Sequence, residues 1–126
     1  MADEVFERGM QIRRDMYGPA RADDELAAAT DFNRPLQEMV TRYCFGEVWD
    51  RPGLSRKIRS MLTVAMVVAL NRPGALKIHL EGALSNGVTK EEIREIMLHA
   101  AIYCGIPAAA DGTRIAAEVL KAAGLE

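Results

Sequence analysis

The run Met61–Leu70, MLTVAMVVAL, most constrains the fold because it is apolar on nearly every side. Ser55 is a good N-cap, so we expect a helix from Ser55 to about Leu70. A helix that is apolar all round is enclosed by protein. A chain of 126 residues has little material with which to enclose one. The pattern therefore predicts that this helix either lies at the centre of the domain or also faces another subunit.

Helical periodicity and turn signals account for the rest of the chain, with no strand pattern of any length. Asp31 is the expected N-cap of the second long helix, and Thr89 and Glu92 form a capping box for a later one. The expected helical segments are approximately Asp3–Tyr17, a short piece in Ala22–Ala29, a helix after Asp31, Ser55–Leu70, the segment between Gly74 and Ser85, Thr89–Cys104 and Pro107–Ala122. The sequence therefore predicts one all-α domain, residues 1–126, of about six helices that assembles into an oligomer.

Charge and cysteine content narrow the classes of function. The net charge of −2 gives no reason to expect binding to nucleic acid or to an acidic membrane surface. The charged N-terminus has no apolar signal core, and the longest apolar run is about half of a membrane span. Cys44 and Cys104 are far apart and outside any metal-binding spacing. Cys104 falls on the expected buried face of its helix, which predicts a buried, inert thiol. These features predict a cytoplasmic protein with reduced thiols, no metal site and no membrane partner.

His79 is the first candidate for chemistry. On a helix its neighbours are Ala75, Leu76, Gly82 and Ala83, of which only Leu76 is large. Another helix or a ligand can therefore approach the imidazole closely. Histidine is the side chain best suited to proton transfer near neutral pH. The alternative is a structural histidine that is hydrogen-bonded inside a helix interface.

Glu47 is the second candidate, because it continues an apolar stripe formed by Leu36, Met39, Val40 and Tyr43. A carboxylate in such a position is expensive to bury and is suited to proton transfer if it is desolvated. The alternative is that the helix frays at Gly46 and Glu47 pairs with a nearby arginine. 

Arg51 and Arg72 lie near the turns that flank the central helix. Arginine suits bidentate binding of a carboxylate. The alternative is that each arginine is an exposed side chain that only solvates the surface.

Three segments carry a family resemblance when they are taken together. They are RYCFGEVWDRPGLSR, the His79 segment NRPGALKIHLEGALSNGV, and YCGIPAA. The chain resembles γ-carboxymuconolactone decarboxylases from its N-terminal helix through Ala109. The resemblance implies an all-α, alkylhydroperoxidase-like fold and assembly into a ring-like hexamer. Related alkylhydroperoxidases use two cysteines and a histidine. Here Arg72 and Ala75 stand where those cysteines would be, so that dithiol chemistry is absent.

The resemblance also implies a function: decarboxylation of 4-carboxymuconolactone or a related lactone acid, without a cofactor, in the β-ketoadipate route of aromatic catabolism. His79 and Glu47 are then the catalytic candidates, for oxyanion stabilisation and proton delivery in an unassigned order. Arg51, Arg72 and Trp49 are the candidates for substrate binding.

The segment Ala110–Arg114 departs from the usual family pattern, which continues Asn-Ser-Ala-Phe-His. This chain has an acid at Asp111 and replaces the histidine with Arg114. A different small-molecule substrate is therefore an open alternative. Two others are a hydroperoxide reductase that uses Cys44 or Cys104, and an oligomer that keeps the fold without catalytic activity.

Overall fold

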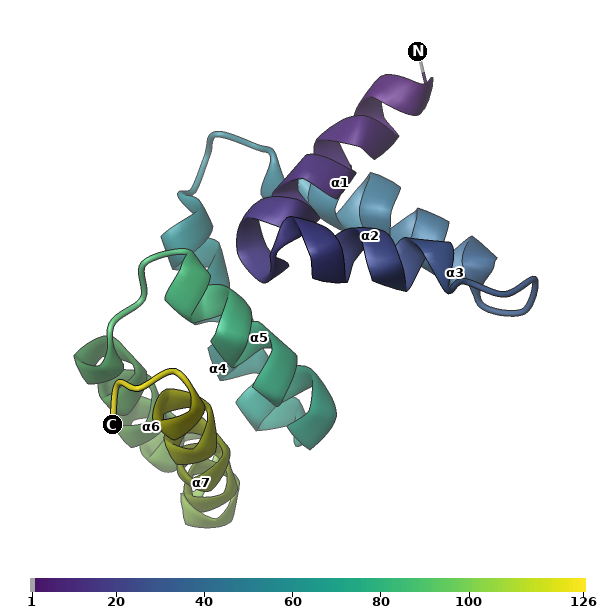
Figure 1. The fold of residues 1–126 in the computed structure, drawn as a ribbon. Helices are drawn as coiled ribbons and strands as arrows, with labels where there is room; N and C mark the ends of the chain where they lie inside the picture. The colour runs from purple at the N-terminus through teal and green to yellow at the C-terminus, as the bar shows by residue number, and fades with distance from the viewer. Residues whose placement is uncertain (1) are drawn as a thin grey trace. The chain divides into compact units, whose positions relative to one another are not determined.

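The computed structural model describes residues 2–126, and all regular elements within that range are helices (Figure 1). The all-α prediction is confirmed. Where about six helices were expected, the described residues form seven α-helices and one π-helix. Their bounds are α1 Ala2–Tyr17, α2 Pro19–Ala27, α3 Arg34–Met39, η1 Val40–Trp49, α4 Arg56–Leu70, α5 Pro73–Ser85, α6 Lys90–Tyr103 and α7 Ile106–Ala122.

The helices divide into two compact units, one ending at Ser55 and the other spanning Arg56–Glu126. In unit 1, α1 packs on η1 and α2. Its core consists of Ile12, Met16, Phe45 and Trp49. The predicted apolar stripe, which runs through α3 into η1, is not the buried one, since Leu36, Met39 and Tyr43 are exposed. The buried positions of η1 are Thr41, Phe45, Gly46 and Trp49.

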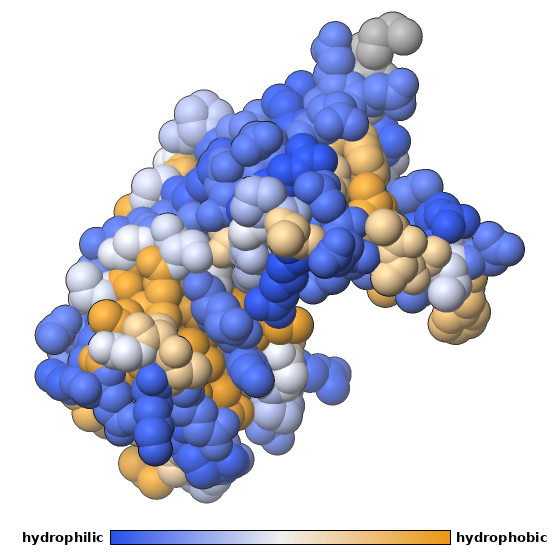
Figure 2. All heavy atoms as spheres, viewed as in Figure 1, coloured by the Kyte–Doolittle hydropathy of each residue, from blue (hydrophilic) through white to orange (hydrophobic). Residues whose placement is uncertain are grey.

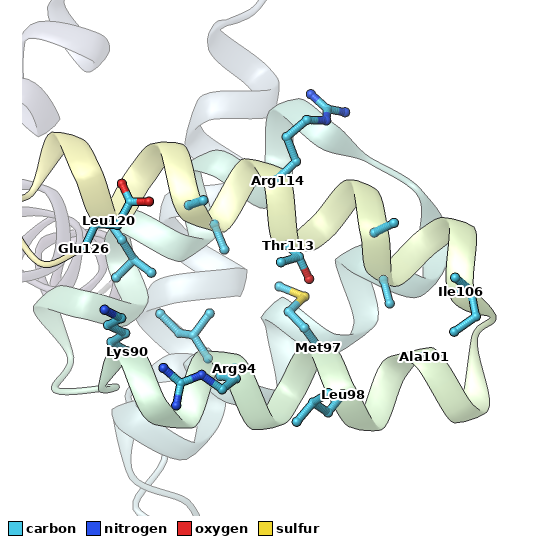
Figure 3. Close-up of a pocket in the computed structure, with 15 residues that line it drawn as sticks. Lys90, Arg94, Met97, Leu98, Ala101, Ile106, Thr113, Arg114, Leu120 and Glu126 are labelled. Atoms are coloured by element: carbon cyan, nitrogen blue, oxygen red, sulfur yellow. The ribbon is translucent and has the colours of Figure 1, made fainter.

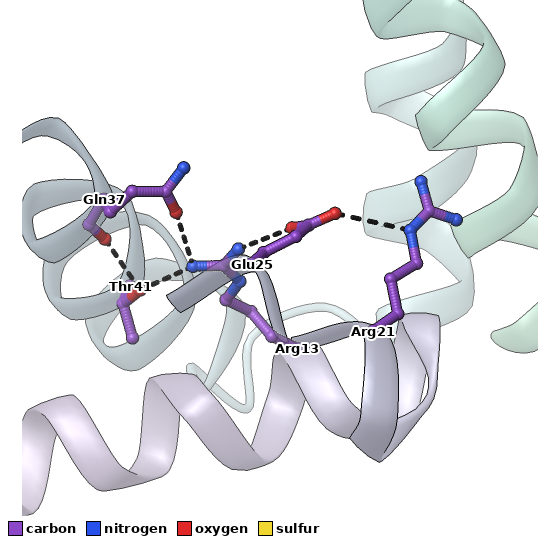
Figure 4. A network of polar contacts seen from close by, with 5 residues as sticks. All are labelled: Arg13, Arg21, Glu25, Gln37 and Thr41. Carbon is purple, nitrogen blue, oxygen red and sulfur yellow. Dashed lines mark hydrogen bonds and ion pairs between the residues drawn. The ribbon is translucent and has the colours of Figure 1, made fainter. Parts of the chain in front are cut away.

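Arg13 of α1 binds side chains of three other helices of unit 1, namely α2, α3 and η1 (Figure 4). Its guanidinium is buried and donates hydrogen bonds to Gln37 Oε1 at 3.1 Å and to Thr41 Oγ1 at 2.9 Å. It also pairs with Glu25 at 2.9 Å, and Arg21 holds the other oxygen of that carboxylate at 3.4 Å. Because a buried guanidinium is tolerated only with such partners, this network fixes α2 and the start of η1 against α1.

In unit 2, α4 packs beside α5, and α6 packs beside α7 (Figure 1). Apolar side chains from all four helices form its core, with Val64, Leu80 and Ala83 completely buried. The capping box of α6 is confirmed: Thr89 Oγ1 accepts from the Glu92 amide at 3.1 Å, and Glu92 Oε1 accepts from the Thr89 amide at 2.9 Å. Sequence signals at helix ends therefore located α6 well.

The apolar helix α4 is buried on one side only. Ser60, Val64 and Val68 are inaccessible, whereas Leu62 and Met66 are exposed. Figure 2 shows further apolar side chains, in orange, on the surface of unit 2. The expectation that α4 is enclosed on all sides does not hold within unit 2, and coverage by another subunit stays a prediction.

Two smaller expectations were wrong. Asp31 does not cap α3; the N-cap position is Asn33, without a side-chain cap, and Asp31 instead pairs with Arg34. Cys104, expected to be buried on the inner face of α6, is exposed at the helix end. There Gly105 adopts a positive φ of 97°, which turns the chain into α7 directly after Cys104.

Candidate functional site

His79 lies in the middle of α5 and is half-buried. Pro73 starts this helix, and Leu76 and Leu80 anchor it in the core of unit 2. The neighbours Gly82 and Ala83 are buried and leave the imidazole little side-chain bulk on its own face. Burial lowers the pKa of His79 from its ordinary value of 6.5, because it disfavours the charged ring. At neutral pH the imidazole is therefore mainly neutral.

Neither ring nitrogen of His79 has a hydrogen-bond partner among residues 2–126. The structural alternative, a histidine hydrogen-bonded inside a helix interface, thus finds no bond within the described chain. The two nitrogens of this half-buried imidazole can therefore hydrogen-bond to a ligand or to another subunit.

Glu47 lies on η1, which runs past Gly46 to Trp49 without fraying. The carboxylate is exposed and has no ion pair among the described residues. Tyr43 and Val48 of the same helix are also exposed. Neither sequence interpretation of Glu47 therefore describes it within unit 1: the side chain is neither desolvated nor paired. A role in proton transfer stays a prediction.

Trp49 and Arg51 follow at the end of η1. The indole is 6% exposed and packs in the core of unit 1, with its ring centroid 5.8 Å from that of Phe45. Arg51 is exposed in the turn that follows. Contact of either side chain with a substrate stays a prediction.

Arg72 is at the N-terminus of α5, on the rim of a small pocket of about 90 Å³. Asp111 and Arg114 of α7 lie on the same rim, and their side chains are 3.4 Å apart. The departure from the family pattern at Ala110–Arg114 is thus placed beside a predicted substrate-binding arginine. The sequence indicated both Arg72 and the segment Ala110–Arg114, but it did not indicate that they line the same pocket.

A larger groove of about 780 Å³ runs between α6 and α7 (Figure 3). Its walls are mainly apolar, with Lys90 and Arg94 among the charged residues that line it. It contains none of the five predicted site residues. Sequence periodicity did not indicate it, because the groove depends on how two adjacent helices diverge.

The remaining chemistry-bearing groups are dispersed. Both cysteines are free; Cys44 is half-buried, and burial raises the pKa of its thiol despite a hydrogen bond with Trp49. His99 is exposed and stacks on Tyr103 with ring centroids 4.9 Å apart. Across residues 2–126 no three His, Cys, Asp or Glu side chains are grouped to hold a metal ion. Over the same range, no helix has the length and apolar character needed to span a bilayer.

The five predicted site residues fall in both units. Glu47, Trp49 and Arg51 belong to unit 1, and Arg72 and His79 belong to unit 2. That they act together in one active site stays a prediction.

Comparison with known proteins identifies the family. Residues 34–118 match the carboxymuconolactone decarboxylase family, a range that holds all five candidates. The chain is 37% identical to a 4-carboxymuconolactone decarboxylase of Acinetobacter baylyi, over 98% of this chain and 92% of that protein. It is 46% identical to the nitrosuccinic acid decarboxylase of Metarhizium robertsii, over 82% of this chain and 72% of that protein. It is also 27% identical to an uncharacterized protein of Paracoccus denitrificans, over 92% of this chain. The chain therefore belongs to the carboxymuconolactone decarboxylase family and is an enzyme of the carboxy-lyase type.

Proposed function

We propose that this enzyme removes CO₂, without a cofactor, from a small acid whose leaving carboxylate is attached close to an electron-accepting group. The first candidate substrate is 4-carboxymuconolactone or a related unsaturated lactone acid, in the β-ketoadipate route of aromatic catabolism. The relative from Acinetobacter baylyi supports it, because the match extends over nearly the full length of both chains.

The second candidate is a nitro-substituted dicarboxylic acid. The relative named for nitrosuccinic acid has the higher identity, 46%, over a shorter stretch. The two substrates share one reaction. The C–C bond to the carboxylate breaks, CO₂ leaves, and the electron pair moves onto a carbonyl or nitro oxygen. A proton then adds to the carbon.

The observation that carries the proposal is the state of His79. Its imidazole is half-buried, mainly neutral, and without a hydrogen-bond partner among residues 2–126. A neutral imidazole N–H can donate to the developing oxyanion in a partly dry site, where such a bond is stronger than in water. We assign oxyanion stabilisation to His79 and proton delivery to Glu47.

The two arginines are assigned to substrate binding rather than to the chemical step. Either Arg51 or Arg72 would hold the carboxylate that does not react, and Trp49 would contribute to the wall of the substrate site. These assignments follow from the family resemblance and from the affinity of guanidinium for carboxylate.

The direct test is turnover by the purified protein, measured for the lactone by ultraviolet absorbance and for nitrosuccinate by CO₂ release. Turnover of either substrate supports the proposal and selects between the two. Absence of CO₂ release from both would reject it.

Four variants then test the assigned roles. His79→Ala should lower kcat by roughly 10²–10⁴-fold while leaving the denaturant midpoint nearly unchanged, because its neighbours are small. Glu47→Gln should also lower kcat. Arg51→Ala should act mainly on KM if it only holds a distal carboxylate. Lys121→Gln, an exposed charge near the end of α7, is the matched control. A lowered midpoint with near-normal kcat in His79→Ala would assign His79 a structural role instead.

The peroxidase alternative depends on the thiols. Cys104 is exposed and Cys44 is half-buried, so both can be alkylated under mild denaturation followed by refolding. Decarboxylation should survive the block, because the proposed mechanism uses no thiol. Loss of the main activity that returns with reductant after a reversible block would favour a redox function.

Assembly and location are part of the proposal. A homohexamer is what the family resemblance implies, and the exposed apolar side chains of unit 2 support association with further copies. The cytoplasmic location rests on the two unpaired cysteines.

A further inference from the structure

We propose that Arg114 and Arg72 together bind the non-reacting carboxylate of the substrate in the small pocket between α7 and the start of α5. Arg114 would then be a specificity-determining residue. This inference rests on the proposed decarboxylase function, but its first test is a binding experiment that does not depend on turnover.

The pocket has an apolar floor and a charged rim. Val68, Leu76 and Ile115 line it and are buried. Arg72 comes from the turn before α5, and Arg114 comes from α7, so two separate elements bring guanidinium groups to one cavity. An apolar floor lowers the local dielectric, and this strengthens the interaction of the guanidiniums with a negatively charged ligand.

The charge on the rim is positive. Asp111 is the single acidic side chain that lines the pocket, against the two arginines. Its contact with Arg114 is long, at 3.4 Å, and the two side chains are 59% and 65% exposed. Exposed pairs of this kind are weak. Because a guanidinium has five N–H donors, Arg114 can bind a ligand carboxylate with or without release of Asp111.

The direction of Arg114 agrees with this assignment. Figure 3 shows the side chain leaving α7 on the side away from α6, although Arg114 is also among the residues that line the large α6–α7 groove. Arg114 lines the small pocket together with Arg72.

The size of the pocket fits one carboxylate rather than a whole substrate. A volume of about 90 Å³ admits a carboxylate and the carbon that bears it, but no ring. The reacting part of the substrate must then lie outside it. His79 is seven residues beyond Arg72, the N-cap residue of α5, so about two helical turns, roughly 10 Å along the axis, separate the two positions. Side chains that extend from both positions can contact opposite ends of a dicarboxylic acid.

Calorimetric titration of the full-length protein with succinate and with propionate tests the pocket directly. Succinate has a second carboxylate, and propionate of similar length does not. The wild type should bind succinate more tightly than propionate. Arg114→Gln should raise the Kd of succinate about tenfold or more, and Arg114→Lys should recover part of the loss. Lys121→Gln removes an exposed charge from the same helix and should bind like the wild type.

Kinetics give the second measurement. With whichever acid is turned over, Arg114→Gln should raise KM by a similar factor and leave kcat within a few fold, because the pocket holds a group that does not react. Denaturant midpoints equal to that of the wild type will show that the variants are folded; this is expected at an exposed position.

The outcomes separate the two proposals. Equal affinity of the wild type for succinate and propionate, or unchanged succinate affinity in folded Arg114→Gln, would overturn this inference even if the enzyme turns over the lactone. Succinate binding that depends on Arg114, without turnover of either acid, would support the pocket and reject the proposed decarboxylation.

Discussion

The backbone of Gly9 in α1 lies directly against the carbonyl oxygen of Thr41 in η1, with no room for even a methyl group between them. The same contact is repeated in reverse, since Gly46 of η1 faces the carbonyl of Val5 in α1. Two glycines on opposite helices therefore let the backbones touch. This close approach also brings Arg13 within hydrogen-bonding distance of Thr41.

Substitution of Gly9 by alanine should destabilise unit 1 by about 1–3 kcal/mol or more, because the added methyl collides with rigid backbone rather than with a movable side chain. Denaturant unfolding followed by the fluorescence of Trp49, in the core of the same unit, measures the effect. Gly53→Ala is the matched control, since nothing lies within 4 Å of the methyl it would add. Equal midpoints for the two variants would contradict the close packing of α1 on η1.

Replacement of Tyr17 by phenylalanine should leave the protein as stable as the wild type or more stable. The Tyr17 hydroxyl is buried and has no hydrogen-bond partner among the described residues, so its removal relieves a desolvation penalty on the order of 1 kcal/mol. The ring keeps its packing and its cation–π contact with Arg21, 5.6 Å from the centroid. Tyr103→Phe, at an exposed site, should be neutral.

The same tyrosine predicts loss of stability at high pH. Burial raises the pKa of Tyr17 to about 12, whereas the unfolded side chain titrates near 10. The unfolded state therefore loses its proton first, and the free energy of unfolding should fall as the pH rises from 10 to 12. Tyr17→Phe should fall less steeply than the wild type over this window. Parallel curves for the two proteins would show that the phenol is not buried as described.

Much of the fold was predictable where a local signal fixes a local structure. Gly18 and Pro19 end α1 and begin α2, and Thr89 caps α6 through side-chain bonds to its own first turn. Such signals act within four residues and survive any tertiary arrangement. They account for most helix boundaries.

The inner face of η1 was not predictable in the same way. Its sequence offers two apolar stripes, one through Met39 and Tyr43 and one through Phe45 and Trp49. Contact with α1 decides between them, because only the second stripe also carries Gly46. Helical spacing places Arg13 on the inner face of α1, four residues after Gly9. Its hydrogen-bond partners could not be predicted in the same way, because they are 12 to 28 residues away in the sequence.

The candidate site was likewise predictable from the sequence only in part. The small neighbours of His79 could be read from helical spacing, and burial in the structure agrees with them. Arg72 and Arg114 line the same pocket because α7 packs against α4 and α5. The two residues are more than 40 positions apart in the sequence. No local pattern contains that information.

Self-association at micromolar concentration is the next prediction. Ile102 and Tyr103 are 80% and 78% exposed, and Met66 and Leu70 of α4 are also open to solvent. Apolar side chains in such number are typical of surfaces that another protein covers. Light scattering should give a mass well above 13.9 kDa, and Ile102→Lys should reduce it. Lys121→Gln should leave the mass unchanged, whereas a monomer mass for the wild type across a dilution series would contradict the prediction.

The last prediction concerns the pH dependence of stability at His79. The pKa of this imidazole is below 6.5 in the folded protein because it is partly buried, so the unfolded chain takes up the proton first as the pH falls. The stability that the neutral ring allows is complete above about pH 6.5 and is lost as the pH drops through the folded pKa. The denaturant midpoint of the wild type should therefore decline more between pH 7.5 and pH 5 than that of His79→Gln. The chain has two histidines, and the other, His99, is exposed, so His99→Gln is a matched control that should retain the decline of the wild type. If His79→Gln followed the wild-type curve, the imidazole would be solvated in the native protein, and its neutral state could not support the proposed hydrogen bond to an oxyanion.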